Sequence, residues 1–412
     1  MLICKLPVGV RKVGDLYKSL YSATGVGFAE MTALFCYFIF GCDSLSGLCR
    51  ILVQSPSHSE LSRAVAEFPG NRFLRRCRRS ILRKYAGQLD PEDFTFAIDD
   101  TENPRYGAKI FGCGRWAQKH KSFFGQKILL LALVDIRRNI AIPIDYAFLS
   151  NRNEPNYKSA VEHALSMIDS CLEEGFPRLQ VVADSWFDSG DLMKELKARS
   201  MTLVVEIKSS RKVRTSTGQW VRYQSLPETF TSPTSEVYAR PLSKKTVGRP
   251  CLRFIESKVL QLRTFRSPVK VVAVFNKRTS KKAFGYYVST DRAMPGARVW
   301  TLFRARWAIE VLFRDLKQNL SFGTLPCQGK NASDLAVCLP LILVTSLRIR
   351  PEIWGMKEGL TIGEMVKRIR TQALDQSIVA LALPHAGELR ERVRSRRSLE
   401  RVGRKPVNRT AA

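Results

Sequence analysis

Hydrophobic positions in the first part of the chain recur at helical spacing. Residues 31–40 form an apolar run that predicts a buried helix, and they are too few to span a bilayer, which needs about 20 residues. Two short helical patterns follow between Ser44 and Phe68, separated by a break rich in Ser and Pro. A basic helix is expected over Phe73–Tyr85. The first 88 residues are therefore predicted to form a helical N-terminal unit.

The pattern changes after Pro91 to alternating and continuously apolar runs, which are typical of strands. The expected elements are strands over 94–98, 127–134 and 140–149, a helix over 157–172, a strand over 179–183, a helix over 191–199 and a strand over 202–207. The second and third strands are expected to form a hairpin. Three strands, a helix, a strand, a helix and a strand is the element order of the ribonuclease-H-like fold. We therefore expect an α/β fold with a mixed sheet and flanking helices.

The alternation of strands and helices stops after residue 208. The next stretch is rich in Ser, Thr, Pro and Gly, carries short apolar pairs, and predicts a β-rich insertion. Strands return over 269–275 and 283–289, before the strongest helical pattern at Trp300–Leu320 and a short apolar core helix at 337–347. The predicted units are a helical unit at 1–88, the first part of the core at 89–208, the insertion at 209–267, the second part of the core at 268–350, and a basic helical region or tail at 351–412.

The chain is strongly basic. Its 67 Lys and Arg residues against 37 acids give a formal net charge of +30, and the resulting self-repulsion is unfavourable unless the partner is a polyanion. Nucleic acid is the expected partner, with an anionic membrane surface as the alternative. Basic residues concentrate in three stretches, 72–84, 208–214 and 390–409. In the first, Arg75, Arg76 and Arg79 are candidate DNA contacts, although a packing domain with a solvated basic face also explains them.

Cysteine usage argues against a disulfide-rich or zinc-binding protein. The ten cysteines are scattered without a Cys-x-x-Cys pair, and the chain has four histidines. Reduced thiols in the core are therefore expected. No charged leader followed by a small-residue cleavage site is evident, so we expect no export.

Three carboxylates have positions that suit metal-dependent cleavage of a phosphodiester. Asp100 follows the first predicted strand and Asp184 follows the fourth, and these strands are neighbours in the predicted order. Glu310 lies in the middle of the strongest predicted helix, where an ion pair with Arg306 or Arg314 is the simpler explanation. Two magnesium ions activate the attacking group, stabilise the departing oxygen and take oxygen ligands. A cluster of like charges of this kind is stable mainly with metal bound.

The helix around Glu310 carries a longer pattern. Phe303-x2-Arg306-x3-Glu310-x6-Lys317 resembles the Y-(2)-R-(3)-E-(6)-K signature of the insertion-sequence-four family of bacterial DDE transposases. Phe303 stands where the family usually has Tyr, so a hydrogen bond from that hydroxyl to DNA is absent here.

Two further motifs extend this resemblance over roughly residues 44–350. Asp99-Asp100-Thr101 is similar to the first acidic motif of the family, and Val182-Ala183-Asp184-Ser185 is similar to the second. Of the two adjacent acids, Asp100 is assigned as the catalytic one because it stands directly before Thr101.

The resemblance implies a cut-and-paste DNA transposase. Asp100, Asp184 and Glu310 would hold two Mg²⁺ or Mn²⁺ ions, and Arg306, Lys317 and Phe303 would contact DNA. The family implies nicking at the element ends, a hairpin intermediate, and attack of the 3′-hydroxyl on target DNA. It also implies a dimer on double-stranded DNA, with no membrane partner, in the bacterial cytoplasm and associated with the nucleoid.

Alternatives remain open at this stage. A nuclease or resolvase without strand transfer keeps the same acids, and so does an inactive DNA-binding derivative of a transposase. An aromatic residue of the insertion is expected to stack on an unpaired base, with Trp220 as the candidate and Trp186 as its rival, although packing in the core explains either residue.

Overall fold

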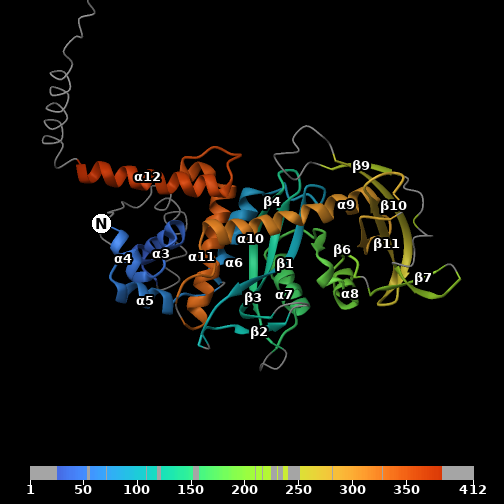
Figure 1. The fold of residues 1–412 in the computed structure, drawn as a ribbon, viewed down its shortest axis with the longest axis horizontal. Coiled ribbons are helices and arrows are strands. Elements are labelled where there is room, and N and C mark those ends of the chain that lie inside the picture. The colour runs from blue at the N-terminus through green and yellow to red at the C-terminus, as the bar shows by residue number, and fades with distance from the viewer. Residues whose placement is uncertain are drawn as a thin grey trace, which may run out of the picture.

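The computed structural model describes residues 26–382, except residues 53–55, 71, 108, 118–121, 152–156, 209, 216, 224–229, 231–234, 240–250, 281 and 327. The predicted basic stretch at 390–409 lies outside the described residues. Figure 1 shows a long molecule in which a central sheet runs between a group of helices at one end and long strands at the other.

The first described part of the chain is helical. It contains α3 (Phe28–Phe40), α4 (Leu45–Ile51), α5 (His58–Ala66) and α6 (Arg72–Lys84). The Ser44 hydroxyl accepts a hydrogen bond from the Gly47 amide at the start of α4, and Ser57 forms a reciprocal capping box with Glu60 at the start of α5. Residues 31–39 of α3 are all buried. The helices predicted for this region are therefore present, and the apolar run lies in the core.

Five strands form the centre of the sheet in the order β4–β3–β1–β5–β6. Their bounds are β1 Phe94–Pro104, β3 Ser122–Asp135, β4 Ile140–Leu149, β5 Val181–Ala183 and β6 Leu203–Glu206. β3 is antiparallel to β1 and β4, whereas β5 is parallel to β1 and β6. The short strand β2 (Cys113–Ala117) pairs with the start of β3. The predicted ribonuclease-H-like mixed sheet is confirmed, with β1 and β5 as neighbours.

β1 continues beyond Ile98, where the sequence pattern placed its end. β3 pairs with β1 through Pro104, so the ladder extends into a polar stretch. Gly125 of β3 permits the close approach of the two strands, because a Cβ atom there would lie 2.4 Å from the carbonyl oxygen of Asn103. Asp99 and Asp100 therefore both lie inside a paired strand, and their side chains point to opposite faces of the sheet.

The region predicted as a β-rich insertion extends the same sheet. Beyond β6 the order is β12–β11–β10–β7–β8, and β9 pairs with β10. A sheet that ended at β6 would expose a row of unpaired backbone groups, and β12 covers that edge. Figure 1 shows these strands at the end of the molecule opposite the N-terminal helices. Their bounds are β7 Lys212–Arg214, β8 Trp220–Arg222, β9 Ser235–Ala239, β10 Cys251–Leu262, β11 Phe265–Phe275 and β12 Gly285–Ser289.

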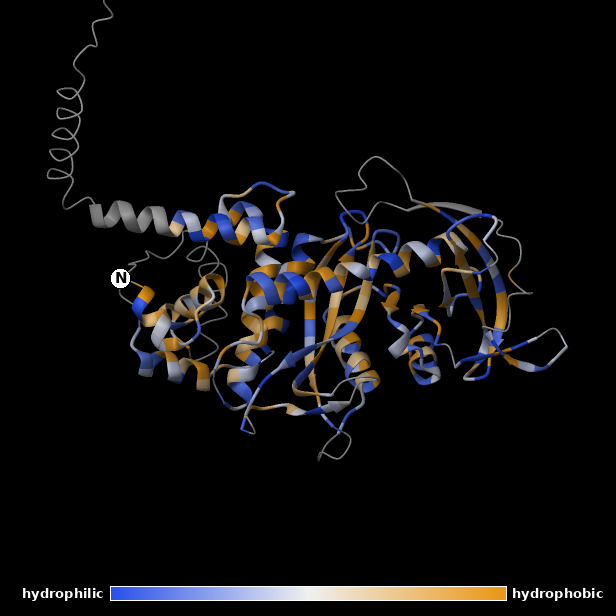
Figure 2. Ribbon diagram, in the orientation of Figure 1, coloured by the Kyte–Doolittle hydropathy of each residue, from blue (hydrophilic) through white to orange (hydrophobic). Residues whose placement is uncertain are grey.

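Helices cover both faces of the sheet, and in Figure 2 hydrophobic residues run along the strands between them. The face that carries Phe96 and Ile98 packs against α7 and α8, and the face that carries Ala97 packs against α9, α10 and α11. The bounds of these helices and the next are α7 Ala160–Glu173, α8 Gly190–Ala198, α9 Gly296–Ala305, α10 Trp307–Asn319, α11 Lys330–Ile349 and α12 Ile362–Ala382.

The helix predicted at Trp300–Leu320 is divided in two at Arg306. The Arg306 amide donates to the Phe303 carbonyl, and the Ile309 amide donates to the Arg306 carbonyl, so two short-range bonds tighten the turn. The prediction of one continuous helix is wrong at this point. Arg306 keeps helical dihedral angles, with φ −52° and ψ −34°, so residues on α10 keep their helical spacing from it.

α11 is long and apolar enough to span a membrane by length and composition, but 94% of its most apolar window is buried inside the protein. It packs against α6 and β4. α3 and α4 pass the same test only as a pair that is bent by 96°. Burial of this extent is what a core helix shows, and a core helix was predicted over part of α11.

The cysteines that lie in well-described segments carry free thiols. They are Cys36, Cys42, Cys49, Cys77, Cys113, Cys171 and Cys338, and most of them are buried. The five buried residues match the expectation of core thiols, whereas Cys49 and Cys113 are only partly buried.

Candidate active site

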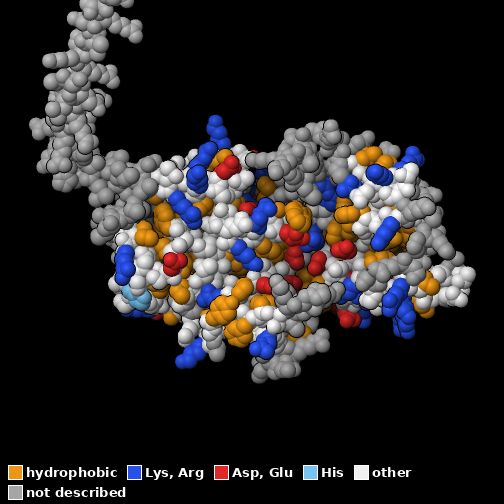
Figure 3. All heavy atoms as spheres, viewed as in Figure 1, with side chains coloured by type: hydrophobic (Ala, Val, Ile, Leu, Met, Phe, Trp, Pro, Cys, Tyr) orange, Lys and Arg blue, Asp and Glu red, His pale blue; other side chains and the backbone are white. Residues whose placement is uncertain are grey.

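The carboxyl end of β5 meets the middle of β1 beside α10, and acidic side chains gather there. β5 ends at Ala183, which pairs with Ile98, so Asp184 leaves the sheet next to Asp99. Figure 3 shows acidic side chains near the middle of the molecular face on which α10 lies, with Lys and Arg side chains at many other places on that face. A local surplus of acid in a chain of net charge +30 is the main electrostatic feature of the site.

Arg306 links two of these acids. One terminal nitrogen of its guanidinium lies 3.1 Å from Oδ2 of Asp99, and the other lies 2.5 Å from Oε1 of Glu310. The side chains of Arg306 and Asp99 are each 13% exposed, so water screens their interaction only in part. The simpler role considered for Glu310, an ion pair with Arg306, is present. The same arginine also binds Asp99, which connects α10 to β1.

Asp100 points to the other face of β1. Its Oδ2 lies 3.1 Å from Nζ of Lys127 on β3. The structure therefore brings Asp99, in place of the predicted Asp100, to the side of the sheet on which Glu310 lies. The physical reason is the alternation of side chains along a strand that continues through both acids. The sequence pattern ended the strand before them, so this alternation was not applied to the pair.

Asp184 has a fixed orientation. It precedes the 3₁₀ turn Ser185–Phe187, and its Oδ1 accepts a hydrogen bond of 2.9 Å from the amide of Trp186. The charge of this carboxylate raises the pKa of Asp99, Asp100 and Glu206, so Asp184 lies within electrostatic reach of all three. Asp184 thus occupies the predicted position at the end of β5.

The acids disfavour one another's charged forms. Burial is the largest cause that raises the pKa of Asp99 to about 7; the Arg306 guanidinium opposes this rise, and the charges of Asp184 and Asp100 add to it. Burial also raises the pKa of Asp100, Lys127 opposes the rise, and Asp184 adds to it. Carboxylates in such a group ionise more readily when a cation binds among them.

Glu206 is a further acid that the sequence analysis missed. It is the last residue of β6, and β6 lies beside β5. Burial raises the pKa of Glu206, Arg306 lowers it, and Asp184 raises it, which places Glu206 within electrostatic reach of both. The sequence did hold a signal for it. Glu206 lies at the carboxyl end of β6, just as Asp184 lies at the carboxyl end of the neighbouring parallel strand β5. We use the name acid cluster for Asp99, Asp184, Glu206 and Glu310.

The acid cluster has the donor chemistry of a site for hard divalent cations, because all its donor atoms are carboxylate oxygens. Within the described residues, no group of three or more His, Cys, Asp and Glu side chains is placed to hold one metal ion. The guanidinium of Arg306 lies between Asp99 and Glu310 and offsets part of their negative charge. The residues fit a divalent cation in their chemistry, and a metal ion between the carboxylates of Asp99 and Glu310 requires the guanidinium to move.

The other residues of the predicted signature surround this site. The Phe303 ring packs against Tyr287 with 4.3 Å between centroids, and the Arg306 guanidinium lies 5.4 Å from the Phe303 centroid. Nζ of Lys317 donates a hydrogen bond of 2.7 Å to the carbonyl oxygen of Glu102 on β1. Both side chains therefore hold α9 and α10 against the sheet, and their contacts to DNA stay predictions.

The arginines of α6 have unequal surroundings. Arg76 and Arg79 are exposed, as a DNA-binding role requires. Arg75 lies 3.0 Å from the fully buried Asp145. Arg75 therefore has a structural partner, whereas Arg76 and Arg79 present their charges to solvent.

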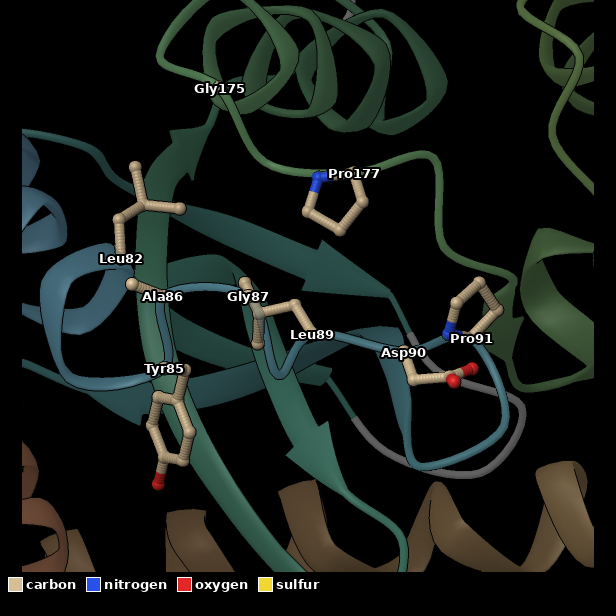
Figure 4. A pocket seen from close by; sticks show the side chains of 9 residues that line it. All are labelled: Leu82, Tyr85, Ala86, Gly87, Leu89, Asp90, Pro91, Gly175 and Pro177. Carbon is tan, nitrogen blue, oxygen red and sulfur yellow. The ribbon is translucent and has the colours of Figure 1, made fainter.

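A pocket of about 570 Å³ lies elsewhere on the molecule. Figure 4 shows it between the end of α6, the loop before β1 and the loop after α7, with Tyr85, Asp90 and Pro177 among its lining residues. The described lining includes no member of the acid cluster. The pocket is therefore separate from the candidate active site.

Part of the chain is similar to a known family. Residues 41–226 match the family model described as DDE superfamily endonuclease. The matched segment contains Asp99, Asp100 and Asp184 and ends before Glu310. No curated protein matches the chain. DDE superfamily nucleases generally use divalent metal ions. The match covers less than half of the chain and makes this segment similar to a DDE-type transposase family, a kind of family that acts on DNA.

Proposed function

We propose that this chain is a DDE transposase that uses divalent metal ions to cut DNA at the ends of a mobile element and to join the freed 3′-hydroxyl to target DNA. The observation that carries the proposal is the acid cluster formed by the middle of β1, the carboxyl ends of β5 and β6, and α10 in a chain of net charge +30. The basic surplus attracts the phosphate backbone, and the local acidic surplus attracts the metal ions that act on it.

The proposed metal ligands are Asp99, Asp184 and Glu310. Asp99 takes the role that the sequence pattern assigned to Asp100, because Asp99 and Glu310 both form ion pairs with the guanidinium of Arg306. When bound, two Mg²⁺ or Mn²⁺ ions supply an activated water or 3′-hydroxyl and stabilise the departing oxygen. Glu206 adds negative charge beside Asp184 and so favours the binding of more than one cation.

Arg306 balances Asp99 and Glu310 in the absence of metal. Its planar guanidinium also suits two oxygens of one phosphate, so release of the carboxylates frees it for the DNA backbone. Lys317 lies two turns beyond Glu310 along α10 and supplies a second positive charge on the side that faces β1. These positions support the DNA-contacting roles that the signature implies.

The finer assignments belong to the same proposal. The spacing of Phe303, Arg306, Glu310 and Lys317 supports membership of the insertion-sequence-four family. Membership of this family implies a dimer that holds two element ends on double-stranded DNA, and a hairpin intermediate. It also implies a cytoplasmic, nucleoid-associated location in a bacterium.

The test uses the purified full chain and a labelled DNA fragment that carries one end of its own element, in Mg²⁺ or Mn²⁺. Cleaved, hairpin and joined products are resolved on a denaturing gel. Wild-type protein is expected to give cleaved and joined products, and Glu310→Gln is expected to give neither. Arg314→Gln, an exposed change on the same helix, serves as the matched control and is expected to keep both activities.

The other outcomes separate the alternatives. Cleavage without any joined product supports a nuclease or resolvase. Specific binding with no cleavage by the wild-type protein supports a DNA-binding derivative. Cleavage that survives in Glu310→Gln contradicts the assigned role of that residue.

A further inference from the structure

Three members of the acid cluster lie in one row across β1, β5 and β6. The register of these strands puts Asp99, Asp184 and Glu206 directly after aligned positions, and the backbone of Asp184 is still extended, with φ −78° and ψ 178°. The residues two positions earlier pack on the α10 side of the sheet; they are Ala97, Val182 and Val204. Side chains alternate along a strand, so the three carboxylates point to that side, on strands about 4.8 Å apart.

The two ends of this row have different partners. The guanidinium of Arg306 lies 3.1 Å from Asp99 and also bonds Glu310. In the part of the chain that the structure describes, neither Asp184 nor Glu206 forms an ion pair, and Arg306 acts on Glu206 only at longer range. Glu206 is half-buried. Burial of a charge without a partner is unfavourable, so this end of the row favours a cation from outside the chain.

We use the name outer pair for Asp184 and Glu206. Hard divalent cations take oxygen ligands, and Mg²⁺ is usually held by one or two carboxylates while water and substrate phosphates complete its shell. Two carboxylates on neighbouring strands can therefore hold one such ion without a third protein ligand. The similarity to DDE superfamily nucleases, which generally use divalent metal ions, indicates the same ligand independently of the acids. The outer pair suits one hydrated divalent ion.

The other end of the row is closed by Arg306. A metal ion between Asp99 and Glu310 must displace a guanidinium that bonds both carboxylates, so one cation is exchanged for another. An ion at the outer pair displaces no cation, so it binds more readily. A DNA phosphate offers the planar guanidinium two oxygens in place of the carboxylates. Binding of DNA therefore favours the release of Asp99 and Glu310.

We propose that the outer pair binds the first metal ion of the site while Arg306 still occupies the space between Asp99 and Glu310, and that the second ion enters there once DNA engages Arg306. This inference rests on the proposed function. It adds Glu206, which lies outside the three-acid motif, to the residues that bind metal. It also couples the number of bound ions to the binding of DNA.

The test counts Mn²⁺ ions on the purified full chain by the electron paramagnetic resonance signal of free Mn²⁺. The titration is made without DNA and with a pre-cleaved element end whose 3′ end lacks the hydroxyl, so that it is neither cut nor joined. A titration of the DNA alone is subtracted. The proteins are wild type, Glu206→Gln, Glu206→Asp, Arg306→Gln and, as the control, Asp191→Asn, a change of an exposed acid on α8.

Wild type and Asp191→Asn are expected to bind about one ion without DNA and about two with it. Glu206→Gln is expected to lose more than about tenfold of the affinity for the first ion, because removal of even an outer partner of a metal ligand costs about tenfold to a hundredfold. Glu206→Asp, which keeps a carboxylate, should recover part of this loss. Arg306→Gln is expected to bind about two ions without DNA. Circular dichroism that matches wild type shows that each variant is folded.

Several results overturn the inference. Wild-type affinity for the first ion in Glu206→Gln removes Glu206 from the site. About two ions on free wild type, or still about one on free Arg306→Gln, shows that Arg306 does not close the second position. If wild type cleaves its element end and Glu206→Gln keeps the first ion, the inference fails while the proposed function stands. If wild type binds no Mn²⁺ with or without DNA, the proposed function itself fails.

Discussion

Two clusters of arginine and carboxylate side chains lie on either side of β1, and they differ in charge balance and in burial. We call the first the α6 cluster. In it Arg78 and Asp145 are fully buried, and Arg75 and Glu174 complete the group at its edge. Two arginines meet two carboxylates there. In the acid cluster Arg306 bonds Asp99 and Glu310 and lies within electrostatic reach of Glu206, whereas Asp184 has the more distant charge of Lys208.

The balance of charge distinguishes a structural ion network from a binding site. In the α6 cluster each charge has a partner of opposite sign, and the network joins α6 to β4 and α7. The acid cluster keeps unbalanced negative charge at an accessible sheet end. Burial of charge is unfavourable unless it is compensated, so the surplus indicates that the compensating cation comes from outside the chain.

The largest predicted effect concerns the two adjacent acids of β1. Asp99→Asn is expected to lose detectable DNA cleavage, because it removes a proposed metal ligand. Asp100→Asn removes the ion pair with Lys127, and its cleavage rate is expected to fall by roughly tenfold to a hundredfold at most. A loss of this size is typical when a residue that supports the metal ligands, without binding the metal, is removed. Rates of cleavage of a labelled element end check this. Equal loss in the two variants would place both acids in the same role.

Arg78→Leu tests the structural side of the comparison. It removes the fully buried arginine that lies 3.6 Å from the buried Asp145, so the free energy of unfolding is expected to fall by about 3–5 kcal/mol. Urea unfolding measures the change. Arg76→Leu, an exposed change on the same helix, is the control and is expected to alter stability by about 0.5 kcal/mol or less. A small effect of Arg78→Leu would remove the distinction between the clusters.

The raised pKa of Asp99 predicts a pH dependence of the metal-free protein. An acid whose folded pKa is about 7 binds a proton in the folded state that the unfolded chain, with its ordinary value of 3.8, has already lost. Stability is therefore expected to fall as pH rises from about 4 to 7, on the order of 2–4 kcal/mol in total. Unfolding free energies of wild type and Asp99→Asn across this range check the sign. If the stability of wild type and of Asp99→Asn changed with pH in the same way, the assignment of this pH dependence to Asp99 would be contradicted.

Metal binding is the smallest of the four effects. Mn²⁺ at ten times its dissociation constant should stabilise the wild-type protein by about 1.4 kcal/mol. Asp184→Asn is expected to lose this stabilisation, because one carboxylate oxygen of the acid cluster is removed. Glu174→Gln, a change in the α6 cluster, should keep it. Denaturant midpoints with and without Mn²⁺ provide the measurement, and stabilisation retained in Asp184→Asn would place the metal elsewhere.

Part of this site was predictable from sequence because its rules are local. The element order made β1 and β5 neighbours, and the helix spacing put Arg306 within reach of Glu310. Whether Asp99 or Asp100 faces α10 could not be predicted from the neighbouring residues alone. It depends on how far β3 pairs along β1, and that pairing is permitted by Gly125, which lies on another strand.

Other features could not be predicted from the sequence for the same reason. The helical pattern of α6 showed a row of arginines, but only Asp145 on β4 decides that Arg78 is buried while Arg76 stays exposed. The strands after β6 read as an insertion because pairing across the sheet leaves no mark on the periodicity of a single strand. Glu206 lacked any motif around it.

The most direct test of the central claim is a change of metal preference at β1. Asp99→Cys replaces a carboxylate by a soft thiolate, which binds Mg²⁺ poorly and Mn²⁺ better. Cleavage of the labelled element end by Asp99→Cys should be absent in Mg²⁺ and return in Mn²⁺, while Asp100→Cys should cleave in both. A metal switch in Asp100→Cys, with Asp99→Cys active in Mg²⁺, would contradict the account and restore Asp100 as the first acid.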